Sequence, residues 1–434
     1  MSSLPPLPVA LLDLLRRAQQ ADNELGTALR ADAKDPTPKT AARLARARAA
    51  ARAAEVWRGA WAADQGTAPP ATAATASRTL LDRYQQAVED LLRAADVCLV
   101  QSSAGKDSLY ILSIVVEVAR RLGMLDKVIV VHCFLGEDAE WPQVAELARR
   151  QAEHHGVRFV QVAAPGGLVA LIDKRGMFPD SARRLCTSTL KRSEADKAIA
   201  MILDALGITR HAVVLVCMGI RAEESPDRRL KAPLSVNTRT SSGNRLVLTW
   251  YPAFQVTQTA VWQRIRDLGL EYHPTYDALL FRLSCIYCVL AGKSHLVRAA
   301  RLAKALGLSA TERFLSLEER IQHTLKPGLS LARIVAEADS LDAAEGPLTW
   351  NRGDAIDHHL GPGNAARWAE NLARAQAAPP PAVPALRPVH AALPGARPDW
   401  LTLPPTAYTR RPRLARPAAL VPDLPDAAGT RPLF

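Results

Sequence analysis

Short apolar runs alternate with longer amphipathic stretches through the middle of the chain. Between the runs, apolar residues recur at helical spacing over 109–122 and 142–155. Strands that alternate with helices in this way form parallel sheets with helices on both faces. We therefore predict an α/β fold, a doubly wound and mostly parallel sheet with flanking helices. The predicted strands are at residues 97–101, 128–132, 158–162 and 212–218.

The pattern changes towards both ends of the chain. Amphipathic and Ala/Arg-rich stretches predict helices over 8–32 and 40–62, and a Pro- and Thr-rich linker follows them. Proline, alanine and arginine dominate the C-terminal stretch, so we expect order to fade beyond about residue 361. The predicted organisation is a helical N-terminal extension and linker (1–77), one α/β domain (78–340) and a largely disordered tail (341–434).

A hexapeptide of small and charged residues joins the first predicted strand to the first predicted helix. Backbone N–H groups at a helix N-terminus are unpaired and can bind phosphate. The Walker pattern does not apply, because Asp107 rather than Ser or Thr follows Lys106. An ordinary strand-to-helix turn is the alternative. The predicted phosphate-binding residues are Ser103, Ala104, Gly105, Lys106, Asp107 and Ser108. Of these, Asp107 would cap the helix or bind a metal ion, and capping is favoured.

Further basic residues follow the loop along the chain. The first, second and fourth strands end at the loop, at Cys133 and just before Arg221, so these ends would meet at one edge of the sheet. Arg221 would hold an anion in bidentate fashion, or alternatively pair with Glu223 or Glu224. Lys191 and Arg192 would contact phosphate or sulfate, or alternatively lie on a solvated helix face.

The cysteines divide into core candidates and ligand candidates. Cys285 and Cys288 have the C-x-x-C spacing of a metal site, a cluster site or a redox pair, with two inert buried thiols as the alternative. Cys186 lies in a cationic segment that would favour its thiolate. Cys98 and Cys217 fall inside apolar strands and are expected in the core.

The composition indicates the kind of partner and the cellular compartment, but not the reaction. A net charge of +12 suits acidic partners such as nucleotides or nucleic acid. We find no apolar run long enough for a membrane span and no secretory signal pattern at the start of the sequence. Six cysteines in 434 residues do not indicate a secreted disulfide framework. We therefore expect a cytoplasmic protein.

Residues 96–338 resemble the phosphoadenosine phosphosulfate (PAPS) reductase family of the adenine-nucleotide α-hydrolase (PP-loop) superfamily. The resemblance rests on motifs that occur in the family's order. They are Ser103–Ser108, residues 131–136 with 140–142, Cys186–Ser188 with Lys191 and Arg192, residues 219–225, Trp262, residues 272–277 and residues 283–288. Ala104 replaces a family glycine, which requires a negative φ at that position.

The resemblance implies an enzyme that binds an adenine nucleotide, either ATP or adenylyl sulfate, and combines nucleotide activation with sulfur transfer. It implies catalytic roles for Lys106, Arg221 and Cys186, and Mg²⁺ as a cofactor if ATP is the substrate. It also implies a four-iron (4Fe-4S) iron–sulfur cluster on Cys186, Cys285 and Cys288. A sulfur donor or a reductant protein would be the partner.

Two other functions stay open at this point. One is a thioredoxin-type PAPS or adenylyl-sulfate reductase that makes sulfite. The chain has no cysteine after Cys288 to match the catalytic cysteine of that type, and Leu185-Cys186 replaces the Cys-Cys pair of cluster-binding relatives. The other is a nucleic-acid-associated protein that binds a nucleotide without turnover, with the basic helices and tail contacting phosphates.

Overall fold

The computed structural model describes residues 88–384 except 90, 181–182, 209–211, 230, 232, 238 and 243–244. The predicted N-terminal helices, the linker and the tail from residue 385 lie outside the described residues.

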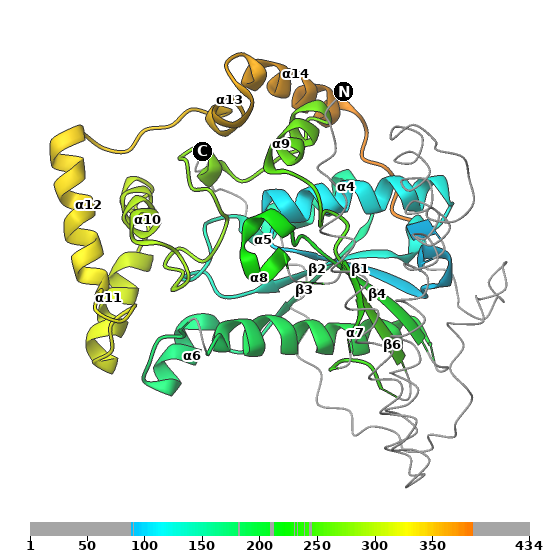
Figure 1. Ribbon diagram of the computed structural model, residues 1–434, viewed down its shortest axis with the longest axis horizontal. Coiled ribbons are helices and arrows are strands. Elements are labelled where there is room, and N and C mark those ends of the chain that lie inside the picture. The colour runs from blue at the N-terminus through cyan, green and yellow to red at the C-terminus, as the bar shows by residue number, and fades with distance from the viewer. Residues whose placement is uncertain are drawn as a thin grey trace, which may run out of the picture.

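A six-stranded sheet forms the centre of the molecule, with the strand order β3-β2-β1-β4-β6-β5 (Figure 1). All neighbouring pairs are parallel except β5 with β6. The predicted α/β fold is therefore confirmed. The strands are β1 (Val97–Ser102), β2 (Val128–Phe134), β3 (Arg158–Ala163), β4 (Ala212–Met218), β5 (Leu234–Val236) and β6 (Arg245–Trp250).

Successive strand residues point to opposite faces of the sheet, and each face is covered by helices. Cys98 and Val100 of β1 pack in a core cluster with residues of α4 (Lys106–Arg121) and α5 (Val144–His154). Val97 and Leu99 pack in a second cluster with α7 (Ser193–Ala205). Figure 1 shows α4 and α7 on opposite sides of the strands. Both faces are thus buried, which is why these strands are almost continuously apolar.

Strands β5 and β6 were not predicted. β6 lies parallel to β4 with Val247 opposite Val214, and β5 adds a short antiparallel edge in which Ser235 lies opposite Thr249. The three residues of β5 are too few for a period-2 pattern to stand out.

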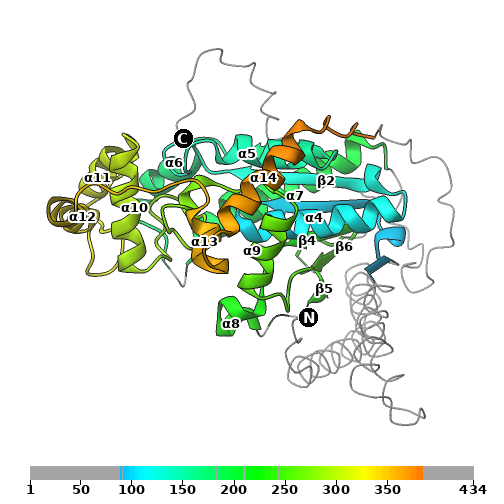
Figure 2. The ribbon, with the colours of Figure 1, turned by 90° about the horizontal axis from the view of Figure 1, so that it is seen from above.

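The helices after the sheet form two groups. α9 (Gln258–Asp267) packs against α4, and Thr257 Oγ1 caps it by accepting from Ala260 N at 3.2 Å. A separate helical layer beside the sheet (Figure 2) consists of α10 (Lys293–Ala305), α11 (Ala310–Ile321) and α12 (Leu331–Glu345). Other helices among the described residues before residue 346 are shorter or lie between the strands, and they include η1 (Leu125–Lys127), α6 (Gly167–Arg175), the π-helical turn η2 (Cys186–Arg192), η3 (Ala222–Glu224), α8 (Pro226–Arg229) and η4 (Pro274–Tyr276).

Two helices lie within the predicted tail from residue 341, so the expectation of a largely disordered segment was wrong for residues 354–377. α13 (Asp354–Leu360) and α14 (Asn364–Ala377) lie across α9 (Figure 1). Ile356 and Trp368 are buried in a cluster with α9, and Trp368 Nε1 donates to Leu270 O at 3.0 Å. Two large apolar side chains at helical positions thus anchor a segment whose composition indicated disorder. None of the described helices is long and apolar enough to cross a membrane.

Candidate functional site

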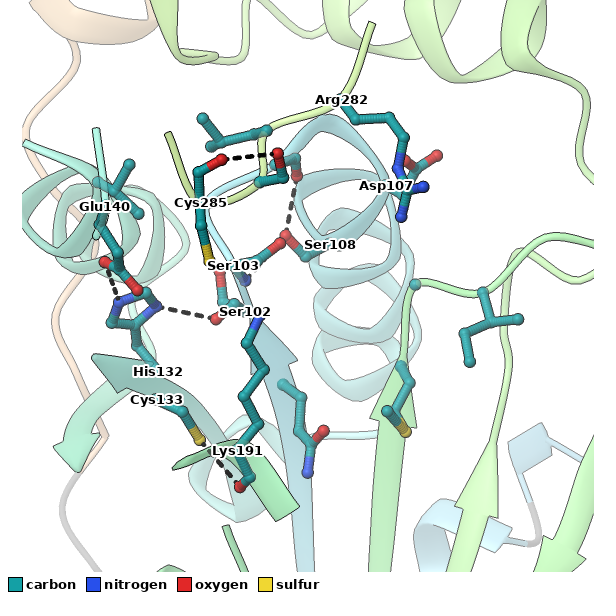
Figure 3. A pocket seen from close by; sticks show the side chains of 18 of the residues that line it. Ser102, Ser103, Asp107, Ser108, His132, Cys133, Glu140, Lys191, Arg282 and Cys285 are labelled. Carbon is teal, nitrogen blue, oxygen red and sulfur yellow. Dashed lines mark hydrogen bonds and ion pairs between the residues drawn. The ribbon is translucent and has the colours of Figure 1, made fainter. Parts of the chain in front are cut away.

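A cavity of about 310 Å³ lies at the carboxyl ends of β1, β2 and β4, where the predicted strand ends meet (Figure 3). The loop after β1 forms one wall through Ser103, Gly105, Asp107 and Ser108. Helix α4 begins at Lys106 with Gly105 at its N-cap, and no side chain caps it. Its positive N-terminal end therefore faces the cavity.

Hydrogen bonds fix the shape of the loop. Ser103 N donates to Ser108 Oγ at 3.3 Å, and Ser108 Oγ donates to Gly105 O at 2.8 Å. Lys106 N donates to the hydroxyl oxygen of Tyr276 at 3.1 Å. Within the described part of the chain, no protein acceptor is assigned to the backbone N–H groups of Asp107 and Ser108. Such N–H groups can bind an anion.

Ala104 has a positive φ of 55°, so the expectation of a negative φ was wrong. The left-handed conformation costs a residue with a β-carbon about 1–2 kcal/mol. The surroundings impose it, because Ala104 N donates to Ser102 Oγ at 3.0 Å and Ala104 O accepts from Gln151 Nε2 at 3.3 Å. The loop therefore keeps a glycine-like backbone with an alanine in it.

Lys106, Asp107 and Arg221 form a charge cluster beside the cavity. Lys106 Nζ lies 2.8 Å from Asp107 Oδ2, and Arg221 Nε lies 2.6 Å from Asp107 Oδ1. Arg221 also pairs with Glu223, as the alternative for this residue anticipated, although its side chain is buried rather than exposed. Asp107 pairs with these cations and does not cap α4, so the capping prediction was wrong.

The charges of this cluster stabilise one another. Burial opposes the charged form of Asp107, but Lys106 and Arg221 outweigh it and the pKa of Asp107 is lowered. Burial also opposes the charge on Lys106, but Tyr276 and Asp107 outweigh it and the pKa of Lys106 is raised. Neither Lys106 nor Arg221 lines the cavity. Their contacts hold the end of α4 in place.

A second group of side chains borders the same cavity (Figure 3). Lys191, Cys133 and Cys285 line the cavity, and Cys133 Sγ donates to Lys191 O at 3.4 Å. Lys191 interacts electrostatically with Cys285, Cys288 and Cys186, so the fold brings the predicted cysteines to one lysine. Arg192 is exposed and does not line the cavity.

The two thiols in the wall are protonated at neutral pH. Burial raises the pKa of Cys285 to about 12, against the opposing charge of Lys191. Burial likewise raises the pKa of Cys133 to about 12, again opposed by Lys191. The thiolate is the nucleophilic form. A reaction at either sulfur therefore requires a bound group or a base that removes the proton.

The residues around the cavity do not assemble a metal site. Among the described residues, no three His, Cys, Asp or Glu side chains are grouped to hold one metal ion. The structure thus does not confirm the predicted ligand set of Cys186, Cys285 and Cys288, nor the alternative of a metal site at Asp107. Lys191, whose charge would repel a cation, lies within the cysteine group.

His132 and Glu140, for which no role was predicted, are buried in the cavity wall. His132 Nδ1 lies 3.0 Å from Ser102 O and His132 Nε2 lies 3.2 Å from Glu140 Oε2. A backbone carbonyl can only accept, so Nδ1 carries a proton and donates to Ser102 O. Both residues lie in quoted motifs, but only the fold shows that they meet.

The arginines of the wall were also not predicted as site residues. Arg228 of α8 and Arg282 line the cavity, and Arg228 pairs with Glu224. Together with Lys191 they place cations around the N-terminus of α4. The sequence around Arg228 and Arg282 is similar to that around ordinary surface arginines, so no local pattern distinguishes them as site residues.

Comparison with known proteins shows a family match over part of the chain. Residues 97–291 match the family model described as the phosphoadenosine phosphosulfate reductase domain. No curated protein matches the chain. A crystal structure of phosphoadenylyl-sulfate (PAPS) reductase from Candida auris in a phosphate complex is similar at 15% sequence identity, with a TM-score of 0.29. The similarity covers 49% of this chain and 94% of that one.

Proposed function

Because residues 97–291 match the phosphoadenosine phosphosulfate reductase domain, we propose that the cavity of this domain binds an adenine nucleotide, ATP or an adenylyl sulfate. The bound nucleotide is activated there for a reaction of sulfur metabolism. The observation that carries the proposal is the N-terminus of α4, where the backbone N–H groups of Asp107 and Ser108 have no acceptor assigned among the described residues and the adjoining cavity is lined by cations.

The loop supplies the anion contacts. The backbone N–H groups of Asp107 and Ser108 bind a phosphate or sulfate group, and the helix dipole of α4 favours its charge. Lys191 and Arg282, which also line the cavity, provide further positive charge. These side chains replace Lys106 and Arg221, which the sequence analysis proposed for this task and which hold Asp107 instead.

Sulfur chemistry would use the thiols of the cavity wall. Cys285 and Cys133 face the space in which the nucleotide binds, whereas Cys186 and Cys288 lie near Lys191 without lining the cavity. Cys285 is therefore the proposed sulfur-handling residue. A sulfur donor or reductant protein would regenerate it. No step here depends on a metal ion or a cluster.

Calorimetry tests nucleotide binding. We expect the wild-type protein to bind ATP or adenylyl sulfate, and Lys191→Met to weaken binding at least tenfold, which is about 1.4 kcal/mol. Lys197→Met is the matched control, because Lys197 pairs with Glu194 outside the cavity wall. Folded wild-type protein that binds none of ATP, AMP and the adenylyl sulfates would overturn the proposal.

A reductase that releases sulfite is the second candidate, and the two thiols beside Lys191 favour it. Incubation with adenylyl sulfate or PAPS and excess dithiothreitol distinguishes the two functions. Sulfite release that Cys285→Ser abolishes, with nucleotide binding retained, would establish the reductase. Binding of ATP without sulfite from either sulfonucleotide would exclude it.

A further inference from the structure

We propose that the segment after α12 shapes the nucleotide loop, with Asp277 and Arg352 acting as positioning residues for Tyr276. Arg352 lies outside the stretch that matches the family model, which ends at residue 291. The consequence for binding rests on the proposed function, whereas the contact geometry does not.

Asp277 is a fully buried carboxylate that gathers donors from two distant parts of the chain. Its Oδ1 accepts from Tyr272 Oη at 2.6 Å, and from the backbone N–H groups of Gly353 at 3.2 Å and Ala355 at 3.1 Å. A buried carboxylate needs such partners, because an unpaired charge away from water is costly. Two of them come from the start of α13. The segment after α12 thus supplies hydrogen-bond donors that the Asp277 carboxylate needs.

Arg352 holds the other side of the same carboxylate. One guanidinium nitrogen pairs with Asp277 Oδ2, and the other donates to the backbone oxygen of Tyr272. The guanidinium carbon lies 4.2 Å from the ring centre of Tyr272 and 4.8 Å from that of Trp368. Arg352 is therefore oriented by hydrogen bonds in its plane and aromatic rings on its faces. A lysine cannot make this set of contacts.

Tyr276 connects Asp277 to the loop at Ser103–Ser108. It is the last residue of η4, directly before Asp277, and it is buried in the cavity wall. Its hydroxyl oxygen accepts from Lys106 N at 3.1 Å and from Leu283 N at 3.2 Å. A β-carbon on Gly105 would come within 3.1 Å of this hydroxyl. Movement of Tyr276 would therefore change the first turn of α4 and the loop that carries Arg282.

The contacts from Arg352 through Asp277 and Tyr276 to Lys106 form one continuous path. It connects the helices beyond the family domain to the anion-binding end of α4. Loss of Arg352 should leave the sheet intact but loosen this loop. A residue that served overall stability alone would not act selectively there.

Hydrogen exchange of the full-length protein tests the path without any ligand. In Arg352→Met we expect the amides of residues 102–110 and 279–286 to exchange about tenfold faster than in the wild type. Arg301→Met is the matched control, because Arg301 bridges Asp342 and Glu345 and donates to Gly346 O in the α10–α12 layer. It should not change exchange in those two stretches.

Two further variants test the same contacts if Arg352→Met does not fold. Tyr276→Phe removes the acceptor itself and should give the same local increase in exchange. Arg352→Lys keeps the charge and should give a smaller one. Unchanged exchange at residues 102–110 in the folded variants would overturn the inference.

Calorimetry with the same proteins separates this inference from the proposed function. If the wild type binds nucleotide, Arg352→Met and Tyr276→Phe should each weaken binding about tenfold. The double variant should be no weaker than either single one, because both act on one path. A wild type that binds no nucleotide, with faster exchange in Arg352→Met, would refute the function and leave the positioning path standing. Nucleotide binding together with additive effects of the two substitutions would refute the path.

Discussion

Gly219 lies directly against the backbone of Asp107, and a β-carbon at position 219 would come within 2.8 Å of the Asp107 carbonyl carbon. Gly219 follows β4, and Asp107 lies in the first turn of α4. The end of one strand thus packs against the helix N-terminus at the cavity. Because the facing atoms belong to the backbone, a larger residue cannot be accommodated by a side-chain rotation.

Gly219→Ala should therefore displace the start of α4. We expect it to lower the free energy of unfolding by about 1–3 kcal/mol, as overpacking does, and to weaken nucleotide binding. Urea unfolding and calorimetry measure the two effects. Gly292→Ala is the control, since no atom outside its immediate neighbours lies within 4 Å of a β-carbon there. Equal losses in the two variants would contradict the close-packing explanation.

Ala104→Gly should be tolerated although Ala104 is buried. Glycine loses the buried methyl group and is more flexible when unfolded, but it adopts the φ of 55° without strain. These effects offset each other, so we expect a stability change within about 0.5 kcal/mol. Ala119→Gly, in the buried interior of α4, should cost about 1–2 kcal/mol by thermal or urea unfolding. A similar loss at both positions would show that the backbone at Ala104 is not strained.

His273 should make the protein less stable in mild acid. Burial lowers the pKa of His273 to about 4. Its Nε2 faces Pro142 O at 2.9 Å, and its Nδ1 accepts from Thr275 N at 3.2 Å, an arrangement that needs a neutral ring. As the pH falls below about 6.5, the unfolded chain takes up this proton before the folded protein does. The free energy of unfolding should therefore fall by a few kcal/mol between about pH 7 and pH 4.

Urea unfolding at several pH values checks this slope. His273→Asn, whose amide oxygen can still accept from Thr275 N, should be less stable at pH 7 and lose less stability on acidification. Part of the slope should remain, because burial also lowers the pKa of His155 to about 3 and of His359 to about 4. A slope unchanged by the substitution would rule out the assignment to His273.

Alkylation should report the protonated state of the cavity thiols. Because the pKa values of Cys133 and Cys285 are raised to about 12, their labelling by iodoacetamide should rise about tenfold per pH unit from pH 7 to pH 10 without a plateau. Lys191→Met should slow labelling of both thiols, because the lysine charge lowers both pKa values. Mass spectrometry of the labelled peptides gives the rates. A plateau below pH 9 would mean that one of these thiols is ionised near neutrality.

Cys98 and Cys217 serve as the internal control for that experiment. Their sulfur atoms lie 3.6 Å apart in the sheet core, as their apolar strand positions predicted. They should resist labelling across the same pH range while the protein is folded.

The sequence determined strands β1 to β4 of the sheet and the position of the loop. Two of the strands are apolar runs bounded by polar residues, at Val97–Gln101 and Ala212–Met218. Strands buried on both faces are continuously apolar, so they can be recognised in the sequence. Because parallel strands end at one edge, the gathering of the loop, Cys133 and Gly219 followed from the strand pattern alone.

Tertiary structure decided which charges face the cavity and which chain segments complete it. Lys106 and Arg221 are conspicuous in the sequence, but Asp107 draws both to itself, whereas Lys191 and Arg282 line the wall. Trp368 anchors α14 in a stretch that composition alone marked as disordered. Local pattern encodes the period of a helix or strand, but the partner of a charge or of a buried ring is set by residues far away in the chain. The loop at the N-terminus of α4 is thus visible in the sequence, while its support by Tyr276, Asp277 and Arg352 exists only in the folded protein.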